Sequence, residues 1–179
     1  MEYRKRIVDS TLDLYLKTIG AVKEGAKSLI IDLRSNGGGV VEEAKGIADL
    51  FLDKDKVIVV EKTKNKGTIE MKAEKEASFK GEVVILCDEY SASASEILIA
   101  ALKENEIAKV VGSLTYGKGV MQELIPVEGG GALKVTIEEF LTPNGNTINK
   151  VGIKPNVEIK DDEKTEEDEQ LQKAIEILK

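Results

Sequence analysis

Apolar residues follow two spacings along the chain, and these predict alternating helices and strands. Helical spacing occurs over residues 11–23, 40–52 and 93–103. Short runs rich in β-branched and aliphatic residues predict strands at 28–33, 56–61, 68–72, 82–87, 109–112, 122–127, 132–140 and 157–159. A strand, a loop and a helix thus follow one another twice before a β-rich second half. This order indicates an α/β domain whose functional loops lie at the carboxyl ends of parallel strands.

The chain of 179 residues is long enough for one domain with its own core, which we assign to residues 1–160. Residues 161–179 are predicted to form an acidic segment followed by a short helix. The acidic run lacks the ligand spacing of a calcium loop and is more typical of a solvated segment than of a metal site. No apolar stretch predicts a signal peptide or a membrane span in this chain.

Composition removes several classes of function. The net charge is −7, the lysines are scattered singly and tryptophan is absent, so nucleic acid and anionic membranes are poor partners. The chain has no histidine, which excludes every Ser-His-Asp or Cys-His mechanism. The single cysteine, Cys87, cannot form an internal disulfide and is predicted to pack as a small hydrophobe. Nucleophilic chemistry would therefore need a lysine as its base.

Ser93 is the first candidate residue, and two interpretations fit it. Ser93 and Glu96 match the S-x-x-E pattern of a capping box, which is the more common use of such a pair. A serine at a strand-to-helix turn also faces free N–H groups and the positive end of the helix dipole, and both favour the negative charge of an attacked carbonyl. The two interpretations are compatible.

Lys118 is the second candidate, and it lies between Gly117 and Gly119. A lysine in such a turn is usually solvated and protonated, because its ordinary pKa is about 10.4. A general base would need a desolvated amine, and Gln122, four residues later, could orient it. Lys-x-x-x-Gln alone is a weak signal.

Three glycines, Gly37, Gly38 and Gly39, separate a predicted strand from a helix. They fit a tight turn, a phosphate-binding loop or an oxyanion hole. The Walker A and dinucleotide-binding patterns are both missing, which disfavours the phosphate-binding loop.

Five segments together resemble one family, the carboxyl-terminal processing peptidases, also called tail-specific proteases. In the family's order they are LIIDLRSNGGG (29–39), SASASEI (91–97), TYGKGVMQ (115–122), TPNG (142–145) and GIKPNV (152–157). Each segment alone is weak evidence, but five matches in order over residues 20–179 are a strong signal.

The resemblance implies a crotonase-like α/β core and a serine endopeptidase that cleaves unfolded or C-terminal regions of polypeptides. It implies that Ser93 is the nucleophile, Lys118 the general base and Gln122 its orienting partner. The backbone N–H groups of Ala94 and of Gly38 or Gly39 would form the oxyanion hole. No cofactor and no metal are implied, and the family's location is extracytoplasmic. No oligomeric state is predicted.

The chain departs from the family pattern in three places. Gly37 replaces the proline of the glycine turn, Asn156 replaces an aspartate, and only residues 1–20 precede the match, where the family normally has a PDZ domain and a signal sequence or anchor. Two rival functions follow: a non-catalytic peptide-binding or scaffold module of the same fold, and a crotonase-type acyl-CoA enzyme. Turnover of a peptide compared with a thioester would separate the three.

Overall fold

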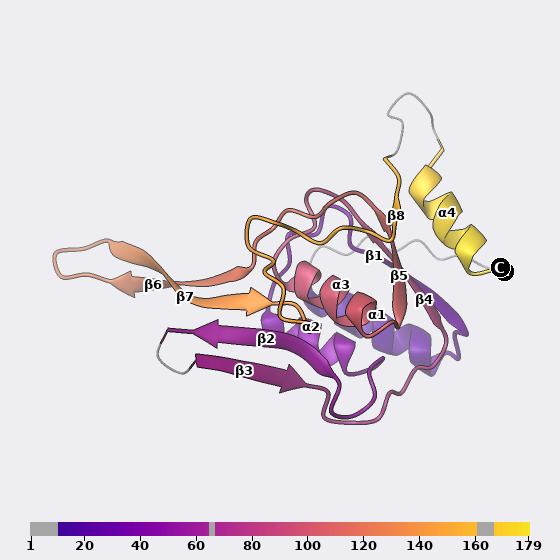
Figure 1. Ribbon diagram of the computed structural model, residues 1–179, viewed down its shortest axis with the longest axis horizontal. Helices are drawn as coiled ribbons and strands as arrows, with labels where there is room; N and C mark the ends of the chain where they lie inside the picture. The colour runs from indigo at the N-terminus through magenta and orange to yellow at the C-terminus, as the bar shows by residue number, and fades with distance from the viewer. Residues whose placement is uncertain (1–10, 65–66, 161–166) are drawn as a thin grey trace.

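The computed structural model describes residues 11–64, 67–160 and 167–179. The elements within these ranges are shown in Figure 1. They are α1 (Thr11–Lys23), β1 (Ser28–Asp32), α2 (Val41–Ala48), β2 (Val57–Thr63), β3 (Gly67–Lys72), β4 (Glu82–Cys87), α3 (Ala94–Glu104), β5 (Ala108–Gly112), β6 (Val120–Pro126), β7 (Ala132–Leu141), β8 (Val157–Glu158) and α4 (Glu169–Ile177). The predicted mixture of helices and strands is therefore confirmed.

A parallel sheet with the order β1-β4-β5-β8 forms the centre of the fold. Successive side chains of β4 point to opposite faces: Val83 and Ile85 join the larger apolar cluster, whereas Val84 and Leu86 join a smaller one. Burial on both faces explains why β4 is a continuous apolar run rather than an alternating one.

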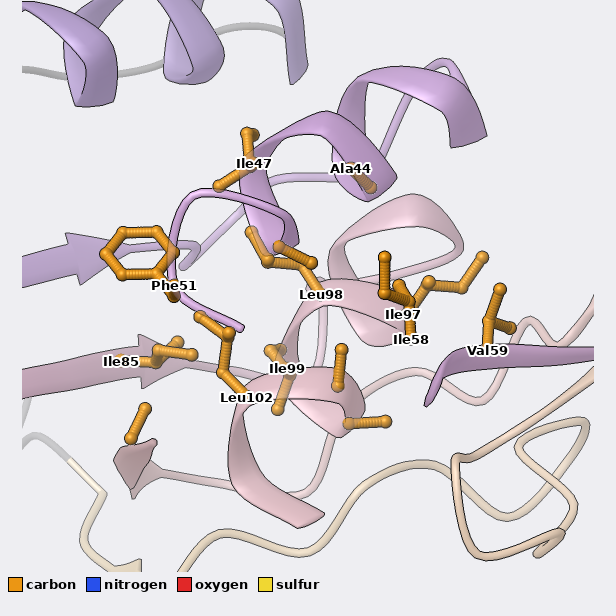
Figure 2. Packing of buried hydrophobic residues seen from close by; sticks show 14 of the residues in the cluster. Ala44, Ile47, Phe51, Ile58, Val59, Ile85, Ile97, Leu98, Ile99 and Leu102 are labelled. Atoms are coloured by element: carbon orange, nitrogen blue, oxygen red, sulfur yellow. The ribbon is translucent and has the colours of Figure 1, made fainter. Parts of the chain in front are cut away.

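Helices α2 and α3 cover one face of this sheet and contribute many residues of the larger cluster. Figure 2 shows Ala44 and Ile47 of α2 facing Leu98 of α3, with Ile85 of β4 close to Leu102. Helix α1 contacts α2 from outside. Because both core helices follow directly on strand-end loops, their packing fixes the positions of those loops.

A second, antiparallel sheet has the order β3-β2-β7-β6. Strand β2 packs against α3 through Ile58 and Val59, which ties this sheet to the core. The hairpin of β6 and β7 extends away from the rest of the molecule (Figure 1). Its base follows Lys118 directly.

Helix α4 covers the opposite face of the parallel sheet, where Ala174 and Leu178 pack against Val84 and Val111. Its N-cap is Asp168, whose carboxylate accepts the N–H of Leu171 at 2.9 Å. The proposed boundary at residue 160 stays a prediction, and the acidic residues 161–166 lie outside the described residues. In the part of the chain that the structure describes, no helix is long and apolar enough to cross a membrane.

Most predicted element ends fall within two residues of the observed ones. Helix α2 is the main exception, since it ends at Ala48 rather than at residue 52. The chain then tightens, because Leu50 and Phe51 donate their N–H groups to carbonyls only three residues earlier. Phe51 and Leu52 remain buried, so the apolar spacing correctly identified a core segment but not where the helix ends.

Cys87 ends β4 in a fully buried position, as predicted from its apolar surroundings. Burial, reinforced by the charge of Asp88, raises the pKa of the Cys87 thiol from 9.0 to about 12. We expect an aromatic disulfide reagent to leave the native protein unmodified at pH 8 and to modify one thiol per chain after unfolding in guanidinium. Rapid modification of the native protein would contradict this burial.

The same shift predicts a pH dependence of stability. Below pH 9 the thiol is neutral in both the folded and the unfolded chain, so its contribution to stability is fully present. Between about pH 9 and 12 only the unfolded chain ionises, and the free energy of unfolding is expected to fall. Denaturant titrations of wild type and Cys87→Ala over this range would isolate the contribution of the thiol.

Candidate active site

Ser93 stands at the N-cap of α3, one short loop after β4. Its backbone has φ 59° and ψ −119°, a conformation that costs a non-glycine residue about 1–3 kcal/mol. Such a strained turn between a strand and a helix exposes the serine hydroxyl at the carboxyl edge of the sheet. The side chain is half-buried. This position is the one that the sequence predicted for a nucleophile.

Ser93 and Glu96 form the capping box that the sequence predicted. The carboxylate of Glu96 accepts the backbone N–H of Ser93 at 2.9 Å, and the Ser93 side chain faces the backbone N–H of Glu96 without a cap hydrogen bond of full geometry. The capping interpretation of Ser93 therefore holds, and it stays compatible with a role as nucleophile.

Glu96 connects the serine to the lysine loop. Its side chain is fully buried, and it accepts hydrogen bonds from the Thr115 hydroxyl and from the N–H groups of Gly117 at 2.7 Å and Lys118 at 2.8 Å. The N–H groups of Ser93 and Lys118 bind the same atom, Oε2. One carboxylate thus brings together two backbones that are far apart in the sequence.

The loop around Lys118 is tightly packed although glycines flank the lysine. A Cβ at Gly119 would lie 2.6 Å from the nitrogen of Asn149, and one at Gly117, where φ is +85°, would lie 3.0 Å from the nitrogen of Gly152. The glycines therefore allow a close approach to residues 149–152. They do not make the loop loose.

The side chains of Lys118 and Gln122 are both exposed. Gln122 donates to the Thr136 hydroxyl at 3.4 Å across the β6–β7 ladder. Lys118 lies in the loop before β6, so strand alternation alone does not put it on one face with Gln122. Within the described residues, Lys118 makes no side-chain hydrogen bond to Ser93 or Gln122. The catalytic roles of Ser93, Lys118 and Gln122 stay predictions.

The glycine turn lies directly against the serine. A Cβ at Gly38, where φ is +92°, would lie 2.5 Å from the oxygen of Ala92, 2.8 Å from the nitrogen of Ala94 and 3.0 Å from Cβ of Ser93. The Gly38 N–H donates to Oδ1 of Asn36 at 2.9 Å. Among the described residues, the N–H groups of Gly39 and Ala94 have no such partner. Of the three predicted oxyanion donors, these two are unoccupied.

Asp88 fastens the glycine turn to the serine loop, and neither periodicity nor motif spacing pointed to it. Its carboxylate accepts the N–H of Ser35 at 2.8 Å and the N–H groups of Tyr90 and Ser91, each at 3.0 Å. Asn36 adds a second connection, since its backbone oxygen accepts the N–H of Ala92 at 3.0 Å. The turn and the serine loop are therefore held as one unit.

The neighbouring serines are committed to this framework. The Ser91 hydroxyl is buried and donates to the Leu33 oxygen at 2.8 Å, and the Ser95 hydroxyl donates to Oδ1 of Asn36 at 3.1 Å. Among the three serines of the segment, Ser93 alone has a hydroxyl that donates no hydrogen bond in the described residues.

Comparison with known proteins decides the family. The model of the family described as "Peptidase family S41" matches residues 7–159. The chain belongs to peptidase family S41. It is 42% identical over 135 residues to the "Carboxy-terminal processing protease CtpA" of Bacillus subtilis (strain 168), a match that covers 75% of this chain and 29% of the relative. It is 43% identical over 154 residues to a "Probable CtpA-like serine protease" of Staphylococcus aureus (strain COL), covering 84% and 31%.

Solved structures agree with this assignment to family S41. The photosystem II D1 C-terminal processing protease matches with a TM-score of 0.74 and 29% identity, over 84% of this chain and 39% of that one. A lipoprotein from Streptococcus agalactiae matches with a TM-score of 0.75 and 17% identity, over 99% and 68%, which shows the shared fold alone. The chain spans about 30% of the length of the curated relatives.

Proposed function

We propose that this S41 chain carries the catalytic core of a serine endopeptidase that cleaves unfolded or C-terminal regions of proteins with a Ser93–Lys118 dyad. The main support is the shared carboxylate of Glu96, which binds the backbone N–H groups of both residues through one oxygen atom. A second support is that the Ser93 hydroxyl donates no hydrogen bond within the described residues, whereas those of Ser91 and Ser95 each donate one.

The proposed reaction begins when neutral Lys118 accepts the proton of the Ser93 hydroxyl. Oγ of Ser93 then attacks the scissile carbonyl carbon, and the N–H groups of Gly39 and Ala94 stabilise the oxyanion. Protonated Lys118 donates its proton to the leaving amine as the C–N bond breaks. Lys118 then deprotonates a water, which attacks the ester carbonyl, and Lys118 returns the proton to Oγ of Ser93 as the bond to the serine breaks.

Lys118 must lose contact with water for this role. Its side chain is exposed in the free protein, whereas a lysine that acts as a base needs a desolvated amine. A bound polypeptide would cover the amine and favour its neutral form, while the carbonyl of the Gln122 side chain accepts one of its N–H groups. Substrate binding would thus assemble the base.

Three further properties are proposed from the family. The fold is crotonase-like with a β-rich second half, the substrates are polypeptides, and the location is extracytoplasmic. The photosystem II D1 C-terminal processing protease is named for processing at a C-terminus, and we extend that specificity to this chain.

The second candidate is a peptide-binding module without turnover. One observation favours it: Lys118 makes no side-chain hydrogen bond to Ser93 within the described residues. This module and the peptidase share the fold and the peptide-binding surface, and they differ only in whether substrate completes the dyad.

A fluorophosphonate probe tests the proposal, because it modifies a serine only where a base and oxyanion donors are assembled. We expect labelling at Ser93, identified by mass spectrometry of the tryptic peptides, and its loss in Lys118→Ala. The matched control is Lys109→Ala, an exposed lysine on β5 that should leave labelling unchanged. No labelling of wild type in the presence of an unfolded substrate would favour the peptide-binding module.

A further inference from the structure

The hairpin of β6 and β7 has apolar side chains on its surface that the rest of the described chain does not cover. Leu124 is 65% exposed and Leu133 is 58% exposed, and Ile125, Val127 and Ile137 are also exposed. Large exposed apolar patches are rare on globular proteins, and where they occur they usually mark a surface that binds another molecule.

Strand β6 is also an edge strand, since the sheet order β3-β2-β7-β6 ends with it. Two hydrogen bonds, from Phe140 N–H to the Gly119 oxygen at 2.8 Å and from Val127 N–H to the Gly131 oxygen at 3.3 Å, fix which residues face β7. Because antiparallel ladders alternate, the N–H and C=O groups of Gln122 and Leu124 point to the open edge.

Pro126 belongs to the same outward-facing series. Proline has no N–H and is tolerated in a strand only where no ladder bond is needed. Its presence agrees with the assignment of positions 122, 124 and 126 to the open edge. The edge therefore offers unpaired backbone groups at Gln122 and Leu124 before it ends at Pro126.

This edge leads to the candidate active site. Val120, the first residue of β6, follows Lys118 by two positions. The loops beside Ser93 have exposed aromatic side chains of their own, Tyr90 and Tyr116, and the Tyr116 N–H donates to the Ser91 oxygen at 3.0 Å. Apolar surface is thus present both along the hairpin and next to the serine.

Charge narrows the choice of partner. The charged residues of the hairpin are Glu123, Glu128, Lys134, Glu138 and Glu139. Four acidic residues against one lysine disfavour a second copy of the same hairpin, and they favour an apolar segment with neutral or basic flanks.

We propose that the open edge of β6 binds an extended segment of the polypeptide substrate as an added strand. The segment carries apolar side chains at alternate positions and runs along the hairpin toward Ser93. Backbone pairing with Gln122 and Leu124 supplies affinity with little dependence on sequence, and the apolar faces supply the preference for unfolded chains. The direction toward Ser93 rests on the proposed peptidase function; the strand addition itself does not.

The test replaces Leu124 with proline, which removes one outward N–H without removing a ladder bond to β7. The control Leu124→Thr keeps that N–H and suits a strand but shortens the apolar side chain. Both variants are made in the Ser93→Ala protein. Binding of a fluorescein-labelled peptide of alternating valine and serine with lysine flanks is measured by anisotropy, and denaturant titration checks folding.

We expect Leu124→Pro to raise the dissociation constant about five- to tenfold, the effect of one lost backbone hydrogen bond, and Leu124→Thr to raise it less. Equal affinity of the proline variant and its parent would overturn the proposal. The proposal would also be overturned if the parent protein sediments as a dimer and the Leu124→Pro variant as a monomer, because the edge would then pair with a second copy of the chain.

Probe labelling distinguishes failure of this inference from failure of the proposed function. It is measured in the protein that keeps both Ser93 and Leu124, in the presence of the unfolded substrate that is proposed to complete the base. Loss of peptide affinity in Leu124→Pro without any labelling of Ser93 would support strand addition and refute catalysis. Labelling of Ser93 together with unchanged peptide affinity would support catalysis and refute strand addition.

Discussion

Ser93→Ala is expected to lower kcat/KM for an unfolded protein substrate by at least about 10⁴-fold, the scale seen when a serine peptidase loses its nucleophile. The Ser93 hydroxyl makes no full cap hydrogen bond within the capping box, so its removal should lower the free energy of unfolding by no more than about 1 kcal/mol. Activity and stability should therefore separate in this variant. Initial rates with fluorescently labelled casein, compared with urea titrations, would measure both.

The matched controls are Ser91→Ala and Ser95→Ala. Each removes a hydrogen-bonded hydroxyl from a buried framework, so each should lower stability by about 1–3 kcal/mol while keeping much of the activity of the folded protein. Equal losses of activity in all three variants, with each protein folded, would refute Ser93 as the nucleophile.

Glu96→Gln is expected to lower both stability and activity. The carboxylate accepts four hydrogen bonds, whereas the amide offers only one accepting oxygen, so an NH₂ group would face at least one backbone N–H in the interior. Each lost bond to a buried charge costs about 1.5–3 kcal/mol. A displacement of Ser93 relative to Lys118 by about 1 Å would lower kcat roughly 100-fold.

The effect should be on kcat rather than KM, because Glu96 is buried and does not reach a substrate. Glu74→Gln, a change at an exposed glutamate two residues after β3, is the control and should alter neither quantity. A Glu96→Gln protein with wild-type kcat would show that the shared carboxylate does not set the geometry of the pair.

Local patterns in the sequence predicted the secondary structure well. The run at 82–87 gave β4 with its observed bounds, because a strand buried on both faces is apolar throughout. The end of α2 was missed because apolar spacing continues to Phe51 and Leu52 after the helix has tightened into a turn. Periodicity records which residues are buried, and it records the backbone conformation only indirectly.

The site was only partly predictable. Ser93, Lys118 and the glycine turn were identified by motif order, yet the connections among them depend on Asp88 and Glu96. Asp88 contacts Ser35 across 53 positions, and Glu96 contacts Lys118 across 22. A carboxylate that accepts backbone N–H groups leaves no pattern in the partner residues, since every non-proline residue has the donor. Such contacts become visible only when the strands are arranged in space.

Helix α4 has a practical consequence for experiments on this protein. Arg34 lies in the segment that leads to the glycine turn, and its guanidinium binds the carboxylate of Asp168, the N-cap of α4, at 2.8 Å. Helix α4 also covers Val84 on the sheet. Removal of the last turns would uncover apolar strand surface and weaken the anchor of the segment that leads to the turn. Affinity tags and fluorophores should therefore leave α4 intact, and shortening of α4 is expected to lower activity at Ser93, although α4 covers the other face of the sheet from α3.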